Sequence, residues 1–409
     1  MSGLPERTRW GVVLLAVSAG MIAGAHIGKA PPALPQLREE LGLGLVTGGW
    51  VVSMFNATGA VLGIVAGSIG DRVGTRRVVL WGFVALALGG LLGAASDSVA
   101  ALLASRFLEG LGFITVAVTT PGLIVAATRV ADLRLALGAW STYMPGGSAA
   151  AMVLAPLLLD GVGWRGLWVA VALVCVLWMA LLLRYAPPDP PAHQRLESKS
   201  LRRNVRLTVS RPGPWLLALA FGGYTVQWVS LMVWLPTFLV EQRGVAVSTA
   251  ALLTALIVAC NVPGNLFGGW LLHRHLPRWL LLALSGVGTG GCLFVIFDPG
   301  FSDALRLACC LAFTVLGGML PPAVLSGPPV VAPGRGQIGT TNGMLIQGSN
   351  IGQVIGPPLA ALMVTLSGSW ESGFWVLEAA AFLVVAAAWA YRGVERRLLA
   401  APPPQHAPG

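Results

Sequence analysis

The sequence predicts an all-α membrane protein with twelve transmembrane helices in two pseudo-symmetric six-helix bundles. Hydrophobic residues make up 56% of the 409 residues and charged residues 10%, whereas a soluble domain carries about 25% charged residues. The apolar runs match the ~20 residues of a membrane-spanning helix and lack the alternation of barrel strands. One long polar segment divides these runs six and six. A lipid-exposed helix bundle satisfies all three observations.

Breaks between the apolar runs define the expected spans in order. Those of the first half are 11–34, 47–70, 78–96, 99–123, 135–158 and 165–185. Those of the second half are 214–240, 248–272, 278–297, 303–325, 337–366 and 371–392. The 53 glycines and 28 prolines are compatible with membrane helices, because neighbouring helices approach closely and satisfy freed backbone groups.

The polar interruption at 186–213 is rich in proline and arginine and predicts a cytoplasmic linker. It separates an N-terminal bundle (1–185) from a C-terminal bundle (214–392), and a tail (393–409) follows. Within the linker, residues 201–209 are compatible with a short basic amphipathic helix on the anionic membrane surface.

Basic residues are distributed unevenly between the two sides of the twelve-span arrangement. Twenty of the 26 Lys and Arg residues fall on the side of the termini and the linker. Positive charge favours the cytoplasmic side, so we expect a multi-pass protein of the cytoplasmic (inner) membrane with both termini cytoplasmic. The net charge of +10 therefore indicates topology, and no nucleic-acid partner is expected. The opposite side is expected to hold Lys29, Arg38, Arg165, Arg243 and Arg306.

The sequence contains no pattern typical of an enzyme or an ATP-driven pump. The five cysteines lie in apolar runs without metal-ligand spacing, so no metal site or cofactor is expected. A nucleotide-binding loop and a nucleophile triad are also missing from the sequence. An ion gradient is then the expected source of energy for any transport.

The turn GSIGDRVGTRR, Gly67 to Arg77, concentrates charge between the second and third spans. Its glycines permit a tight turn, and its arginines can anchor the turn on the positive side of the membrane. Asp71 gains nothing from that anchor and needs a partner, either a nearby cation or the N-terminus of another helix.

Features of the first half recur about 200 residues later. The turn between spans eight and nine reads GWLLHRHLPR from Gly269, with glycine and arginine at the offsets found from Gly67. GWRGLW from Gly163 is likewise matched by GSWESGFW from Gly368. Internal repeats of this kind are typical of secondary transporters, whose substrate sites lie between the repeats.

The charged turn resembles the G-x-x-x-D-R-x-G-R-R signature of the major facilitator superfamily, with Thr75 at a frequently basic position. The resemblance spans residues 10–392 and implies the fold of that family. It also implies a conformational lock between the halves, formed by Gly67, Asp71, Arg72, Gly74 and Arg76.

RFLEGLG, from Arg106, resembles the span-four pattern of proton-coupled members of the family. This implies a proton-coupling role for Arg106 and Glu109, which share one helix face. The alternative is a structural pair of mutually neutralising charges. The span-five motif of many drug/proton antiporters is absent with its proper spacing, since YMPGGSAA retains only Pro-Gly-Gly.

The resemblance places a substrate cavity among spans one, four, seven and ten, flanked by two, five, eight and eleven. The polar candidates there are His26, Lys29, Tyr224, Gln227, Asn261, Asn265, Gln347 and Asn350. Each has a structural alternative: Lys29 as an interfacial lysine, His26 as a packing residue, and the amides as hydrogen-bonding links between helices.

We therefore expect a secondary active transporter that moves a small organic solute by alternating access, coupled to protons. Its expected partners are a small-molecule substrate, protons and the lipid bilayer, and a monomer is expected. Few acids and two basic candidates favour an anionic or neutral solute. A drug or metabolite efflux antiporter is the alternative transporter, and a non-transporting sensor or scaffold on the same fold is the alternative of another class.

Overall fold

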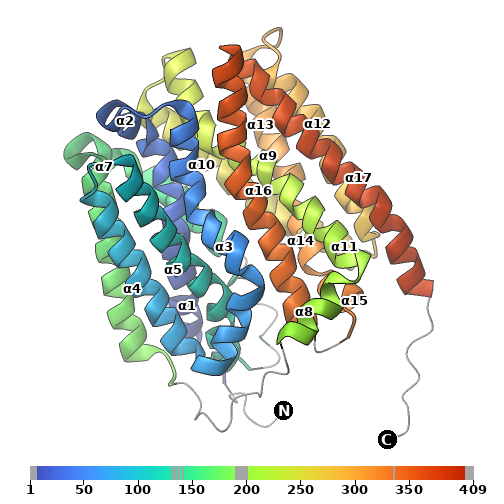
Figure 1. Ribbon diagram of the computed structural model, residues 1–409. Helices are drawn as coiled ribbons and strands as arrows, with labels where there is room; N and C mark the ends of the chain where they lie inside the picture. Colours follow the sequence, from blue (N-terminus) through green and yellow to red (C-terminus); the bar gives the residue numbers. More distant parts are fainter. Residues whose placement is uncertain are drawn as a thin grey trace, which may run out of the picture.

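The structure is a computed structural model that describes residues 7–129, 132, 136, 139–140, 142–188, 201–334 and 337–400. Side chains are described for these residues except 64–73, 201 and 398–400. Within this part of the chain all regular structure is helical (Figure 1). The first helix, α1 (Trp10–Gly28), begins and the last, α17 (Gly373–Ala400), ends at one end of the molecule, called here the terminal end. Helix α2 (Ala30–Leu41) lies at the opposite end.

Two groups of long helices form the two halves. The N half contains α1 (Trp10–Gly28), α2 (Ala30–Leu41), α3 (Leu45–Val73), α4 (Thr75–Ala94), α5 (Val99–Ala127) and α7 (Tyr143–Tyr185). The C half contains α9 (Pro212–Arg243), α10 (Val247–Ala259), α11 (Asn261–His273), α12 (Arg278–Phe297), α13 (Asp303–Gly318), α14 (Leu320–Leu325), α16 (Ile338–Ser367) and α17 (Gly373–Ala400). Shorter elements are α8 (Leu201–Val209), α15 (Pro328–Val331) and the 3-10 helix η4 (Trp370–Ser372).

The described residues contain 11 helical segments long and apolar enough to cross a membrane. The longest, α7, has 43 residues, about 65 Å of helix and twice the hydrocarbon thickness. Gly163 interrupts it with φ 65° and ψ −175°, values that favour glycine. Leu159 accepts a hydrogen bond from Gln36 at the opposite end, and Leu183 accepts one from Arg76 where α4 begins. The chain therefore reverses at Gly163, and α7 supplies the fifth and sixth of the expected twelve crossings.

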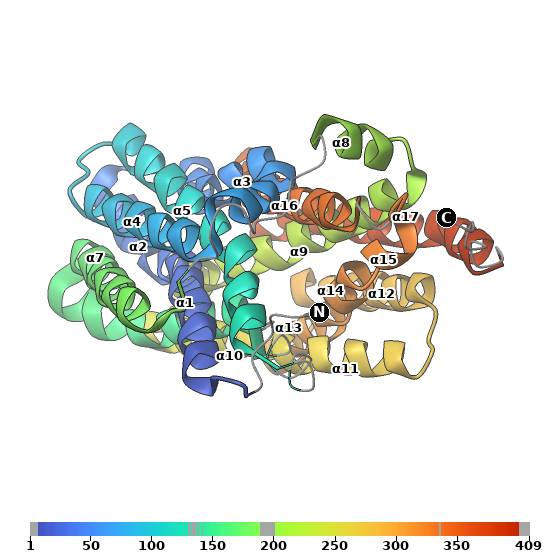
Figure 2. The same ribbon diagram turned by 90° about the horizontal axis from the view of Figure 1, so that it is seen from below.

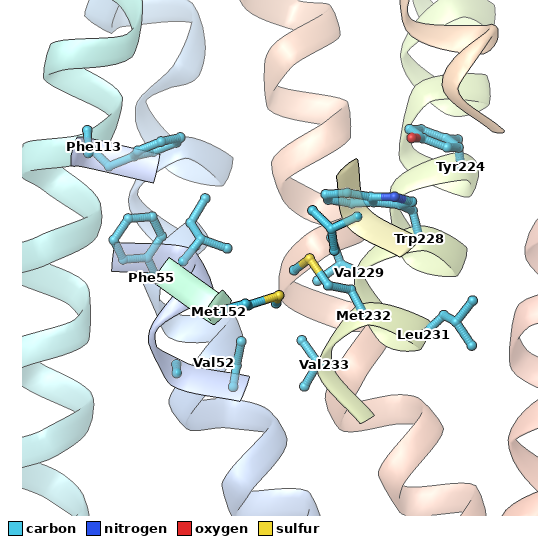
Figure 3. Packing of buried hydrophobic residues seen from close by; sticks show 14 of the residues in the cluster. Val52, Phe55, Phe113, Met152, Tyr224, Trp228, Val229, Leu231, Met232 and Val233 are labelled. Carbon is cyan, nitrogen blue, oxygen red and sulfur yellow. The ribbon is translucent and has the colours of Figure 1, made fainter. Parts of the chain in front are cut away.

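The two halves pack side by side through α3 and α16, with further contacts of α7 on α10 and α2 on α9 (Figures 1 and 2). Glycines make the α3–α16 approach possible: a Cβ added at Gly59 would lie 2.5 Å from Asn350 Cγ. Buried side chains of both halves, Met152 and Met232 among them, belong to one continuous hydrophobic cluster (Figure 3).

Two segments near the terminal end bear on the sequence predictions. The amphipathic helix expected at 201–209 is confirmed as α8. The last helix continues past the expected limit of 392 to Ala400. Glu395 accounts for this extension, because its buried carboxylate accepts hydrogen bonds from the backbone N–H groups of Arg278 (3.2 Å) and Trp279 (3.1 Å) at the start of α12.

A polar contact outside the spans joins the chain just before α1 to the chain just after α5. Arg129 Nε and the Thr8 hydroxyl each donate to Asp132 Oδ2 at 2.6 Å. These hydrogen bonds, first that of Arg129, lower the pKa of the Asp132 carboxyl below its ordinary value.

An ion pair joins the halves at the opposite end, where Arg38 of α2 donates to Glu241 of α9. The side chains are 22% and 36% exposed, so the pair is partly screened by solvent and contributes modestly to closure of this end.

We expect Arg38→Glu to shift the population toward an open opposite end by about two- to fivefold, the equivalent of about 0.5–1 kcal/mol. The double variant Arg38→Glu/Glu241→Arg should restore the parental population, because the pair is re-formed with reversed charges. Spin labels at the exposed positions Gly44 and Ala246 would report the distance between halves. Identical distance distributions in the parent and the single variant would contradict this role.

Candidate functional site: a buried charged cluster

Four ionisable side chains meet inside the N half: His26, Lys29, Arg106 and Glu109. All four are 0% exposed. His26 lies in the last turn of α1, and Lys29 follows where α1 continues into α2. Arg106 and Glu109 lie on α5, one turn apart on one face. Packing of α1 against α5 brings the two pairs together.

The Glu109 carboxylate is the centre of the cluster. Its Oε1 accepts a hydrogen bond from Lys29 Nζ at 2.6 Å, and its Oε2 accepts one from Arg106 Nη1. His26 Nδ1 lies 3.1 Å from the same Oε1 and 3.3 Å from Lys29 Nζ. Depending on its tautomer, this nitrogen donates to the carboxylate or accepts from the ammonium group.

Surrounding groups hold the two cations in place. Lys29 Nζ lies 4.4 Å from the centre of the Trp168 ring, and the Arg106 guanidinium lies 4.8 Å from that of Phe55. Arg106 Nε donates to the backbone oxygen of Val51 at 3.1 Å. Glycine provides room on the α4 side, because a Cβ at position 89 would lie 2.7 Å from Glu109 Cγ.

The cluster has an unbalanced formal charge. With Lys29 and Arg106 protonated, Glu109 ionised and His26 neutral, the charge is +1 in a fully buried site. Arg106 Nη2 and Trp168 Nε1 are also buried without hydrogen-bond partners among the described residues. An isolated buried charge is costly, so this arrangement favours either loss of one proton or arrival of an anion.

The structure confirms that Arg106 and Glu109 contact each other deep in the bundle, while their role in proton coupling stays a prediction. The expected position of Lys29 at the opposite face is wrong, because the residue is fully buried against Glu109. The pairing of Lys29 with Glu109 was missed, as was the contact with Trp168. Their sequence signals were a lysine inside an apolar run and the tryptophans of GWRGLW, neither of which specifies a partner.

Three of the predicted substrate-binding residues form one network inside the C half. Asn261 Nδ2 donates to the Tyr224 hydroxyl at 2.8 Å, and Asn265 Nδ2 donates to Asn261 Oδ1 at 2.7 Å. Gln227, also on α9, instead donates to the backbone oxygen of Leu377 on α17. A substrate role for these four residues stays a prediction.

Gln347 and Asn350 lie where the halves meet. Gln347 Nε2 donates to the backbone oxygen of Ala60 on α3 at 2.6 Å, across the two halves. Asn350 donates to the oxygen of Ile346 on its own helix and packs against Gly59. In this conformation both residues contribute to packing between α3 and α16, and substrate binding by them stays a prediction.

The predicted conformational lock lies partly outside the described residues. This applies to the side chains of Gly67, Asp71 and Arg72. Gly74 has φ 108° and precedes α4, a conformation that favours glycine. Arg76 donates to the backbone oxygen of Leu183 on α7, which ties the turn to the same half.

Two bundles of helices that are long and apolar enough to cross a membrane are the architecture of a multi-pass membrane protein. A family model described as Major Facilitator Superfamily matches residues 12–345. The chain belongs to this superfamily of secondary transporters, as the charged turn and the span-four motif predict.

Individual proteins are similar to the chain over most of its length. It is 28% identical to the probable sulfoacetate transporter SauU of Cupriavidus necator over 84% of each chain. It is 29% identical to monocarboxylate transporter 11 of Homo sapiens, over 96% of this chain and 85% of the other. Among solved structures, a bacterial homolog of the human lysosomal transporter Spinster superposes with a TM-score of 0.78 at 17% identity, covering 97% and 98% of the two chains.

Proposed function

We propose that the protein is a proton-coupled secondary transporter of small organic anions. The observation that carries this proposal is the buried cluster of Lys29, Arg106 and Glu109 with a formal charge of +1. An anion that reaches the cluster neutralises it and finds two unused donors, Arg106 Nη2 and Trp168 Nε1. The names of relatives support the same class, since they include sulfoacetate, monocarboxylate and cyanate transporters.

Proton coupling follows from the same charge balance. When Lys29 is protonated, the cluster carries a charge of +1 and attracts an anion. When Lys29 loses its proton, Arg106 and Glu109 remain as a neutral pair. Protonation and anion binding therefore support each other, and each can favour a conformation in which the cluster is accessible. Because all four side chains are fully buried in this conformation, exchange requires movement of the surrounding helices.

Uptake by purified protein in proteoliposomes tests this function. Sulfoacetate, lactate, cyanate and nicotinate would be compared with a neutral sugar and with tetraphenylphosphonium, each with and without an imposed pH gradient. We expect saturable accumulation of at least one anion in response to the gradient. Preferential movement of the lipophilic cation would instead favour a drug efflux antiporter, and folded protein that moves no anion would refute the proposal.

We further propose that the terminal end faces the cytoplasm, supported by the excess of basic residues on that side. Reporter fusions after His193 and after Pro402 should both be active inside the cell. Activity of both reporters outside would reverse the orientation.

Asp71 is proposed to lock the cytoplasmic seam between the halves, supported by its place in the family signature. Asp71→Asn is expected to lower the transport rate severalfold without reducing the yield of folded protein. The substitution removes the negative charge with which Asp71 would pair across the cytoplasmic seam, so the closed seam is destabilised. Asp160→Asn, which alters an exposed acid three residues before the reversal of α7 at Gly163, is the control. An unchanged flux in Asp71→Asn would show that the aspartate has no such role.

A further inference from the structure

A separate cavity of about 260 Å³ lies inside the C half. It is lined by residues of α9, α10, α12, α13, α16, α17 and η4. Trp234, Phe238 and Trp370 line it with aromatic rings, and Trp370 packs edge-on against the other two at centroid distances of 6.1 and 5.9 Å. Most of the remaining wall is aliphatic. The cavity therefore suits an apolar ligand body.

Two buried polar side chains also line this cavity. The Arg306 side chain is 10% exposed and anchored by a hydrogen bond from its Nε to the backbone oxygen of Ile296 at 2.7 Å. Ser230 is 2% exposed, and its hydroxyl has no hydrogen-bond partner within the described part of the chain. Leaving a buried hydroxyl unsatisfied costs free energy, and a ligand atom can remove that cost.

The charges around the aromatic rings select the sign of the ligand. The guanidinium groups of Arg306 and Arg243 lie 5.9 and 5.7 Å from the Phe238 ring centre. A cationic ligand would meet these two positive charges at the ring where it would otherwise bind. Two acids, Asp303 and Glu371, also line the cavity. Asp303 Oδ1 lies 3.3 Å from Arg243 and 3.6 Å from Arg306. Both acids are exposed, Asp303 by 72%, so solvent screens them and they balance the buried Arg306 less than a buried acid would. An anionic group is therefore favoured beside Arg306.

Residues of α9 define the length of the cavity and the route by which a ligand can enter it. Ser230 and Phe238 are eight residues apart, about 12 Å along the helix. Phe238, Arg243 and Trp370 also line a neighbouring, more open cavity of about 540 Å³. The ligand can thus enter past Arg243, with its apolar body reaching inward toward Ser230.

We propose that this cavity is a second binding site, for an aromatic or short-chain carboxylate of about ten to fifteen non-hydrogen atoms. The apolar body lies among Trp234, Phe238 and Trp370, and the carboxylate pairs with Arg306. The proposal concerns residues of the C half alone and does not depend on the transported substrate or on proton coupling.

The test uses 2-naphthoate as the probe and the full chain in nanodiscs of zwitterionic lipid. Calorimetric titration, corrected with empty nanodiscs, should give saturable binding that is at least about tenfold tighter than that of the neutral 2-naphthylmethanol. In Arg306→Gln this difference should disappear. No saturable binding to the parent, or tighter binding of 2-naphthylmethylammonium, would overturn the proposal.

A matched pair of glycine variants tests the location. Gly373 lines the cavity in helical conformation (φ −58°, ψ −25°), and a Cβ there meets only Phe297 at 3.6 Å and Val364 at 3.9 Å. Gly373→Leu should fill the cavity and weaken binding at least about tenfold. Gly393→Leu, on the same helix with nothing within 4 Å of an added Cβ, should bind like the parent.

Folding is checked by size-exclusion chromatography before each titration. Leu307→Trp provides a second filling variant from α13 in case Gly373→Leu is poorly folded. Parental affinity in a folded filling variant would show that the probe binds elsewhere.

Discussion

Glu109→Gln is expected to abolish the pH-driven accumulation of substrate in proteoliposomes while exchange of substrate across the membrane continues. The carboxylate balances Lys29 and Arg106, so its loss leaves the cluster unable to alternate between a charged and a neutral state. We expect accumulation to fall by at least about tenfold, the equivalent of about 1.4 kcal/mol. Uptake after a pH step and counterflow at constant pH measure the two activities separately.

The same substitution should reduce stability. Removing one partner of a buried ion pair costs about 3–5 kcal/mol, because the remaining charges stay buried without compensation. Uptake must therefore be normalised to folded protein. Glu378→Gln is the matched control, since this acid lies on α17 in the other half and is partly exposed. If folded Glu109→Gln still concentrates substrate after a pH step, Glu109 has no coupling role and the pair is structural.

Lys29→Met is expected to eliminate both accumulation and exchange of anions, with a smaller loss of stability than Glu109→Gln. The remaining Arg106–Glu109 pair is neutral, and a methionine side chain can pack in the space beside Trp168. The cluster then lacks the positive charge that attracts an anion. Counterflow exchange and thermal unfolding, both measured on the purified variant, check the two parts of this expectation.

A second substitution at Lys29 tests whether the residue supplies a fixed positive charge or a proton that it can release, and the other lysine of the chain provides the control. Lys29→Arg keeps a permanent positive charge, so exchange should persist while pH-driven accumulation falls. Lys199→Met changes the other lysine of the chain, in the middle loop, and should behave like the parent. Parental exchange in folded Lys29→Met would rule out Lys29 as a group required for anion transport.

The sequence identifies the charged residues of the buried cluster, but it does not show which of them contact one another across helices. Arg106 and Glu109 share a helix face three residues apart, so helical periodicity predicts their contact. Lys29 and Glu109 are 80 residues apart, and no local pattern relates them. Their contact depends on the packing of α1 and α4 against α5, including a glycine at position 89 that leaves room for Glu109.

The cavity in the C half likewise depends on how distant helices pack together. Its lining comes from helices that are distant in the chain, and an aromatic residue in an apolar run is as compatible with lipid contact as with a cavity wall. Arg306 illustrates the difficulty: the sequence places it at the opposite side of the membrane, and the structure adds that its side chain is largely buried beside Phe238.

The sequence by itself determined the class of protein, the order of its helices and much of their extent. The span expected at 278–297 coincides with α12, and the sharp reversal falls at Gly163, between the expected fifth and sixth spans. These features follow from hydrophobicity and local backbone preference, which each segment carries alone. Tertiary structure decided which buried charges meet, because burial in a membrane bundle depends on neighbouring helices. Lys29 is therefore a partner of Glu109 and not an interfacial lysine, since packing of α1 on α5 removes it from water and lipid and leaves that carboxylate to balance its charge.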